Sequence, residues 1–230
     1  MKSTELGGLT PPTTTSKHSP DSDKPTVRVK ELSERDRRRL LMHFLELDDS
    51  DRLLRFGTVL PDELITRYVQ MLDFSRDKLF GVYDDNLRLA GVGHLAFAPR
   101  EAMPVLSDAT LKEHIAEFGV SVSATARGLG IGSKLFERAA IHCRNEDVDT
   151  LYMHCLSSNQ TMIHIAKKAG MEIHRDFGEA DAYLKLTPAS PGTMLAEAVE
   201  EQFAQLDYTL KANAKAALKL WKRLPGIKGK

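Results

Sequence analysis

The sequence has little cysteine, no excess charge of either sign and no long apolar run. Its 230 residues contain 32 Lys and Arg against 32 Asp and Glu, so the formal net charge is zero. A neutral balance gives no chain-wide basic field that would hold nucleic acid nonspecifically, and no run of about 18 apolar residues exists to span a bilayer. We therefore expect no nucleic-acid partner and no transmembrane segment.

The two cysteines, Cys143 and Cys155, lie in apolar periodic segments. A chain of this length does not need disulfide bonds for stability, so we predict buried free thiols and a cytoplasmic location. The first 26 residues lack the apolar core of a secretory signal and contain four Ser, six Thr and four Pro. This composition predicts a disordered leader over residues 1–26.

Beyond the leader, the hydrophobic periodicity predicts strands and helices in a mixed order, with strands at 27–30, 78–83, 87–97, 111–122, 150–156, 171–177 and 182–186. Helices are expected from Ser33, from Pro61 to about Asp73, after the glycines near residue 130, after Asn159, and from Thr193 to about Leu224. The turn-forming residues 84–86 predict an antiparallel hairpin. The pattern indicates one α/β or α+β domain at 27–188, followed by a C-terminal helical segment at 189–230.

A glycine-rich segment, Arg127-Gly128-Leu129-Gly130-Ile131-Gly132, stands between a predicted strand and a predicted helix. Glycines let a ligand approach the backbone closely, and the helix N-terminus adds roughly half a positive charge. The segment predicts a phosphate-binding loop, with a tight turn that binds nothing as the alternative. A P-loop is excluded because Ser133 precedes Lys134, and a Rossmann fingerprint is excluded because the third glycine comes one residue early.

This loop, with Arg127, Gly130 and Gly132, is followed by Asn159 before a second helix that ends at Gly170. The pattern resembles the GNAT superfamily of acyl-CoA-dependent N-acyltransferases over about residues 26–186. The resemblance implies the GNAT fold: a mixed, mostly antiparallel central sheet flanked by helices, here with an extra C-terminal helix. It also implies acetyl-CoA as co-substrate, and we expect no metal ion.

The resemblance further implies where coenzyme A binds. Val120 and Val122 would meet the pantetheine arm through their backbone, and Asn159 would meet the same arm near the second helix. The pyrophosphate would lie against Arg127, Gly128, Leu129, Gly130, Ile131, Gly132 and Ser133.

Four short strings give a narrower likeness, to the acetyltransferase domain of Pat-like bacterial protein lysine acetyltransferases. They are His43-Phe44-Leu45, Leu54-Arg55-Phe56, Ala116-Glu117-Phe118 and the segment 162–171. An amine must be neutral to attack a thioester, and a lysine amine has a pKa near ~10.4, so a general base is useful. Glu117 occupies the position of the glutamate thought to act as base in these domains.

Glu117 also lies in an otherwise apolar strand, three residues before Val120, which favours desolvation and a raised pKa. A solvent-facing carboxylate is the alternative. On the leaving-group side the tyrosine of many family members is replaced by Ala166. Tyr152, His154 and His164 are conceivable substitutes, although residues in such positions more often have structural roles.

The sequence thus predicts an N-acyltransferase that moves an acetyl group from acetyl-CoA to an amine, either a protein lysine or a small molecule. The alternative is a catalytically weak or inactive GNAT-like module that binds acyl-CoA for sensing or partner interaction. The missing tyrosine at Ala166 supports this alternative.

The C-terminal helix has an apolar stripe and a basic end. Residues 27–207 carry 22 basic and 29 acidic side chains, whereas 208–230 carry seven basic and none acidic. The stripe contains Met194, Leu195, Ala198, Phe203, Leu206, Leu210, Ala214, Ala217, Leu218 and Trp221. It must be covered. The covering surface is one of four alternatives: its own domain, a second subunit in a homodimer, a larger partner protein or an anionic membrane surface.

Overall fold

The structure is a computed structural model that describes residues 27–97 and 114–223. The predicted leader at 1–26 and the first residues of the strand predicted at 111–122 lie outside the described residues. The predicted boundary at residue 188 between domain and C-terminal segment stays a prediction.

A seven-stranded mixed sheet forms the centre of the domain, in the order β1-β2-β3-β4-β5-β7-β6. All neighbouring strands are antiparallel except β4 and β5, so the predicted mixed, mostly antiparallel sheet is confirmed. The strands are β1 (Lys30–Glu31), β2 (Lys78–Tyr83), β3 (Leu89–Phe97), β4 (Ile115–Val122), β5 (Thr150–Leu156), β6 (Glu172–Asp176) and β7 (Glu179–Lys185).

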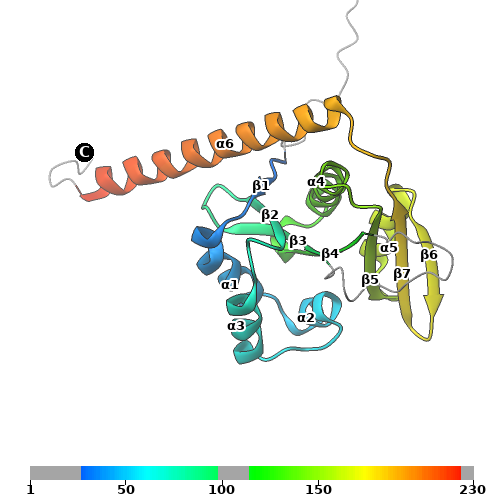
Figure 1. Cartoon of the computed structure of the whole chain (residues 1–230). Helices are drawn as coiled ribbons and strands as arrows, with labels where there is room; N and C mark the ends of the chain where they lie inside the picture. Colours follow the sequence, from blue (N-terminus) through cyan, green and yellow to red (C-terminus); the bar gives the residue numbers. More distant parts are fainter. Residues whose placement is uncertain (1–26, 98–113, 224–230) are drawn as a thin grey trace, which may run out of the picture.

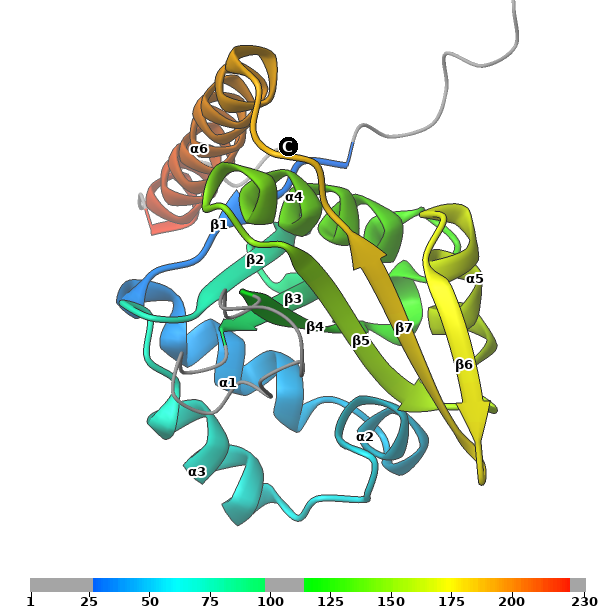
Figure 2. The same ribbon diagram turned by 45° about the vertical axis from the view of Figure 1, so that its right-hand side comes forward.

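Helices cover both faces of this sheet (Figure 1, Figure 2). On one face, α1 (Arg37–Leu45) and α3 (Asp62–Met71) bury Leu40, Phe44 and Ile65 against β2 and β3. On the other face, α4 (Ile131–Asn145) and α5 (Gln160–Lys168) pack on the larger apolar core. Each helix buries its apolar side because apolar area removed from water is the main stabilising contribution.

One helix was not predicted. Helix α2 (Asp49–Phe56) has no buried residue, and Leu53, Leu54 and Phe56 are its only apolar side chains. Its ends are nevertheless marked in the sequence. Asp48 accepts a hydrogen bond from the Asp51 N–H at 2.8 Å, and Gly57 adopts a left-handed φ of 74°. These are the preferred caps of a helix N-terminus and C-terminus.

Strand β4 shows a strict alternation that decides how its side chains lie. Ala116 and Phe118 are buried in the core under α4, and Val120 and Val122 pack against the same core. Glu117 lies on the opposite side of the strand and is exposed. The desolvation expected for Glu117 is therefore wrong, because its strand is apolar on one face only.

The long helix α6 (Pro191–Arg223) lies across α4, outside the sheet (Figure 1, Figure 2). Its Glu197 carboxylate binds the side chains of Arg138, His142 and Asn145, all from α4. Arg138 is only 1% exposed. Among the described helices, none is both long and apolar enough to cross a membrane.

The described part of the predicted apolar stripe of α6 does not pack on its own domain. Met194, Leu195, Phe203, Leu206 and Leu210 are all exposed. The domain is contacted instead by a neighbouring side of the helix that carries Glu197, Glu201, Ala204 and Tyr208. This side of α6 faces the domain because Glu197 and Glu201 neutralise the buried Arg138 guanidinium.

The prediction for the cysteines is confirmed. Cys143 and Cys155 are both free and buried. Burial raises the pKa of the Cys143 thiol to about 12, so the thiol stays protonated near neutral pH.

Candidate active site

The central feature of the site is a gap between two neighbouring strands. The parallel ladder of β4 and β5 joins only residues 115–117 to residues 150–152, although β4 continues to Val122 and β5 to Leu156. Over 118–122 the side of β4 that faces β5 pairs with no strand among the described residues. Backbone N–H and C=O groups at such an edge are available to a ligand.

The glycine loop closes one end of this gap. Gly128 and Gly130 have left-handed φ values of 77° and 78°, which non-glycine residues rarely adopt. Gly130 is the N-cap of α4, so the first backbone N–H groups of that helix have no carbonyl partner within it. The loop and helix dipole together favour an anion at this position.

A cavity of about 550 Å³ runs along the gap and the loop. Of the residues predicted to bind coenzyme A, those that line it are Val120, Val122, Arg127, Gly128, Gly130, Ile131, Gly132, Ser133 and Asn159. Leu129 is not among them; it is 51% exposed and lines a neighbouring cleft of about 710 Å³. Glu117 also lies outside the lining, on β4 at the point where the strands part.

Asn159 has a clear local role. It is 7% exposed, and its Oδ1 accepts a hydrogen bond from the Met162 N–H at 3.1 Å. It therefore caps α5. Its side-chain amide N–H groups remain for a ligand in the cavity that it lines.

Arg127 forms an ion pair with Asp51 of α2 across the cavity. Burial raises the pKa of Asp51 from its ordinary value, and the Arg127 charge partly offsets this effect. The arginine predicted to hold pyrophosphate is thus already bound to a carboxylate, and an anionic ligand would compete with Asp51 for it.

A buried histidine fixes β4 from the other face of the sheet. His43 of α1 lies 2.8 Å from the Leu89 carbonyl through Nδ1 and 2.8 Å from the Ser121 hydroxyl through Nε2. Burial lowers the pKa of His43 to about 4. The ring is therefore neutral, with Nδ1–H donating to Leu89 and Nε2 accepting from Ser121.

A chain of polar groups lies beside Ser121 on that face. An Arg55 Nη atom donates to the Tyr68 hydroxyl at 3.1 Å, the hydroxyl lies 2.9 Å from His94 Nδ1, and His94 Nε2 lies 3.3 Å from Asp77. Burial would raise the pKa of Asp77, but hydrogen bonds from His94 and Arg76 lower it.

The Arg55 guanidinium stacks on three aromatic rings, those of Phe44, Phe56 and Tyr68. It also covers Gly119, where an added Cβ would lie 3.0 Å from Cζ of Arg55. Arg55 lines the cavity, and no carboxylate in the described part of the chain lies within ion-pair distance of it. It brings a positive charge next to the gap.

Glu117 is paired in the ladder with Tyr152. The Tyr152 hydroxyl donates to Asp181 at 2.6 Å, and His154 lies 2.8 Å from the same carboxylate. Desolvation and Asp181 raise the pKa of Tyr152. Tyr152 and His154 are therefore engaged with Asp181.

Among the other acid candidates, His164 lines the cavity from α5. Ala166 is 1% exposed and belongs to the core, so that position offers no proton donor. Sequence reasoning missed Asp51, Ser121 and Arg55 as cavity residues because α2 was not predicted and because no spacing motif joins them. The available signals for this segment were the caps of α2 and the string Leu54-Arg55-Phe56.

Comparison with known proteins agrees with this geometry. Residues 33–171 match the model of the Acetyltransferase (GNAT) family. No curated protein sequence matches the chain at a significant level.

Solved structures share the fold. The GNAT domain of S. lividans PAT superposes with a TM-score of 0.57 and 20% identity, covering 70% of this chain and 92% of that domain. Spermidine N-acetyltransferase from Vibrio cholerae, in complex with CoA and spermine, gives 0.52 and 18%, covering 69% and 95%. Arabidopsis thaliana NAA60, in complex with a bisubstrate analogue, gives 0.53 and 14%, covering 71% and 100%.

At these identities the neighbours establish the fold, and the narrower likeness to Pat stays a prediction. The family match covers more than half of the sequence, including the glycine loop and the parted strands. This chain belongs to the GNAT acetyltransferase family.

Proposed function

We propose that this protein transfers an acetyl group from acetyl-CoA to an amine, with Glu117 as general base. The observation that carries the proposal is the gap between β4 and β5, which lies beside the glycine loop and begins at Glu117. The residues along the gap fit coenzyme A. The free edge of β4 suits the amides of pantetheine, and the α4 N-terminus suits a pyrophosphate.

In the proposed reaction the amine lone pair attacks the thioester carbonyl carbon and its proton passes to the Glu117 carboxylate, directly or through water. The C–S bond then breaks and coenzyme A leaves as a thiolate, which takes a proton from solvent. An ordinary thiol has a pKa of about 8.5, so the thiolate leaves readily without a dedicated acid. The exposure of Glu117 supports access of the amine and of water to the carboxylate.

The acceptor is proposed to be cationic in its resting form. The acidic excess of residues 27–207 favours approach of a protein lysine or of a small amine with other positive groups. A panel of lysine peptides, polyamines and simple amines, incubated with acetyl-CoA and followed by mass spectrometry, tests this class.

Glu117→Gln tests the base. We expect the turnover number to fall by roughly 100-fold or more, the usual contribution of general base catalysis, while coenzyme A affinity measured by calorimetry stays within about 2-fold. Glu179→Gln, which removes another exposed carboxylate from the same sheet, is the matched control and should leave turnover unchanged.

Two results would contradict the proposal. Unchanged turnover in Glu117→Gln removes Glu117 from the role. Tight coenzyme A binding with no transfer to any acceptor favours the alternative module, which binds acyl-CoA for sensing or partner interaction.

A further inference from the structure

Helix α6 presents a row of large apolar side chains on the side that faces away from the domain. Leu195, Val199, Phe203, Leu206 and Leu210 are 67%, 43%, 55%, 57% and 68% exposed. They recur at intervals of three and four residues over about 22 Å of helix, which places them in one row. We call these five residues the outer stripe.

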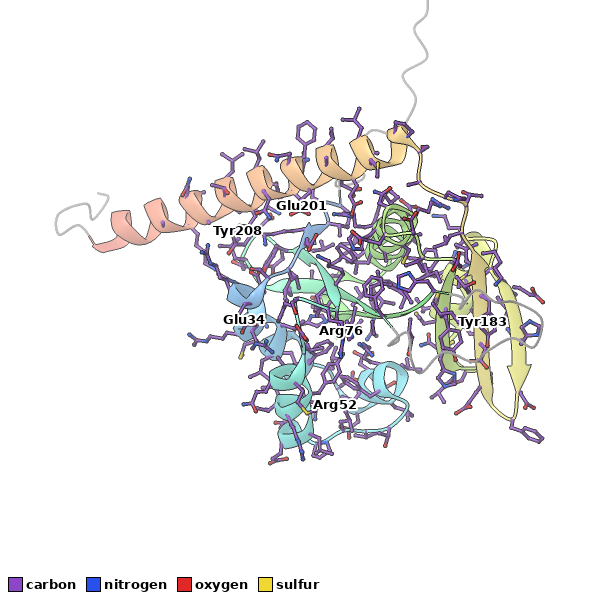
Figure 3. The ribbon with its side chains drawn as sticks, in the orientation of Figure 1. Glu34, Arg52, Arg76, Tyr183, Glu201 and Tyr208 are labelled. Atoms are coloured by element: carbon purple, nitrogen blue, oxygen red, sulfur yellow. The ribbon has the colours of Figure 1, made fainter. Side chains whose placement is uncertain are left out.

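The described charged residues of α6 point the other way. The described ones are Glu197, Glu200, Glu201, Asp207, Lys211 and Lys215, and each is partly buried. Glu201 accepts from the Glu31 N–H at 3.0 Å, and Asp207 lies 3.8 Å from Arg28. Figure 3 shows Glu201 and Tyr208 on the domain side of the helix.

The outward half of α6 therefore carries no charge between residues 194 and 216. A surface in contact with water normally has charged residues at a quarter or more of its positions. A face with five exposed apolar side chains and no charge is typical of a helix that packs against an equally neutral surface.

The placement of the two described lysines of α6 argues against a membrane as that surface. Helices that bind anionic membranes carry Lys and Arg beside the apolar face. Here Lys211 Nζ donates to the Tyr83 carbonyl at 3.3 Å and lies 3.5 Å from Asp85, and Lys215 donates to the Asn86 carbonyl. These two lysines are directed to the β2–β3 turn.

The outer stripe is complementary to itself when a second helix runs antiparallel to it. A two-fold axis near residue 203 sets Leu195 against Leu210 of the other copy and Val199 against Leu206, with Phe203 beside its own equivalent. No charge meets a like charge across this stripe. We propose that the protein forms a homodimer through antiparallel pairing of the outer stripes of two α6 helices.

The arrangement is compatible with the rest of the molecule. The domain packs on the opposite side of α6 (Figure 1), so pairing through the outer stripes places each domain on the outer side of the helix pair. The cavity along the β4–β5 gap has no lining residue from α6, so both copies remain open to ligand.

The first test is the oligomeric state of the full chain by light scattering after gel filtration. We expect twice the chain mass at micromolar concentration, and a dissociation constant at least roughly 100-fold weaker in Leu206→Lys, which places two charges at the seam. Met71→Lys, at another exposed apolar residue (71%), is the control and should leave the mass unchanged. A monomeric wild type, or Leu206→Lys that dimerises like wild type, overturns the proposal.

A second measurement does not depend on the stability of that variant. Leu195→Cys combined with Leu210→Cys should give a disulfide-linked dimer on mild oxidation, while either single variant should not, because each cysteine meets leucine in the partner. Native Cys143 and Cys155 are buried and give little background. Linked dimers from both single variants would indicate parallel pairing and overturn the antiparallel proposal.

Vesicles separate the membrane alternative. The wild-type chain should not sediment with vesicles of phosphatidylcholine containing about a third phosphatidylserine. Sedimentation that Leu206→Lys abolishes, without dimer formation in solution, assigns the outer stripe to a lipid surface and overturns the proposal.

Discussion

Removing the Glu197 carboxylate should loosen the attachment of α6 to the domain. Arg138 is 1% exposed, and its charge is neutralised by Glu197 and, at 3.6 Å, by Glu201. Glu197→Gln keeps the size of the side chain but leaves the guanidinium with only the more distant carboxylate. Leaving a buried charge without its partner strongly destabilises the folded state.

The expected loss of folding free energy follows from the difference in the pKa of Glu197 between the folded and unfolded states. Burial alone would raise the pKa of Glu197, but hydrogen bonds from His142 and Asn145 and the Arg138 charge outweigh it and lower the pKa to about 2, from an ordinary 4.5. At about 1.36 kcal/mol per pH unit, this corresponds to roughly 3 kcal/mol of folding free energy at neutral pH. The carboxylate is 16% exposed, so we expect a loss of roughly 2 to 3 kcal/mol in the variant.

The assay is urea unfolding followed by circular dichroism at several pH values. At pH 7 the midpoint should fall by about 1 M, given a slope of roughly 2 to 3 kcal/mol per M. Because the folded pKa is lowered, the contribution is complete above pH 4.5 and is lost as pH falls towards 2. The difference between wild type and Glu197→Gln should therefore be constant from pH 7 to 5 and shrink below 4.5.

Glu137→Gln is the matched control. Glu137 pairs with Lys134 on the exposed side of α4, where both side chains are about half exposed, and such pairs contribute about 0 to 1 kcal/mol. Equal stability of the two variants, or a difference that does not change between pH 7 and 3.5, would refute the reasoning.

Three further predictions concern the site. Asp51→Asn frees Arg127 and should tighten coenzyme A binding several-fold in calorimetry; weaker binding would show that the ion pair positions the arginine instead. Gly91→Ala places a Cβ 2.5 Å from the Ile131 side chain, so thermal unfolding should show a loss of roughly 1 to 3 kcal/mol, and wild-type stability would contradict the packing. Because burial lowers the pKa of His43 to about 4, the neutral ring contributes fully to folding stability above pH 6.5, and this stability is lost as the pH falls from 6.5 towards 4. A His43→Gln variant whose stability depends on pH as steeply as that of the wild type between these values would contradict this reasoning.

The strands and most helices could be predicted from local pattern. The predicted ranges 78–83 and 150–156 coincide with β2 and β5, because both segments alternate or are continuously apolar between clear turns. The exposure of Glu117 could also have been predicted from the sequence. It shares with Gly119 and Ser121 the less apolar side of an alternation with Phe118 and Val120.

Other features could not be predicted because they join distant parts of the chain. Tyr68, His94 and Asp77 come from different segments and meet only once the sheet and α3 have packed. The orientation of α6 depends on Glu197 meeting Arg138, 59 residues earlier, and no periodicity reveals that pair. Local rules locate elements, whereas the face that an element buries depends on its partners.

The gap between β4 and β5 also affects the stability of the sheet. The described sheet is continuous from β1 to β4 and from β5 to β6, and only three residue pairs join these halves. A ligand lying along β4 would act as a missing strand and tie the halves, so saturation should slow amide hydrogen exchange in both and raise the melting temperature with ligand concentration. The domain thus keeps inside its sheet an edge of the kind that most proteins expose only at the perimeter.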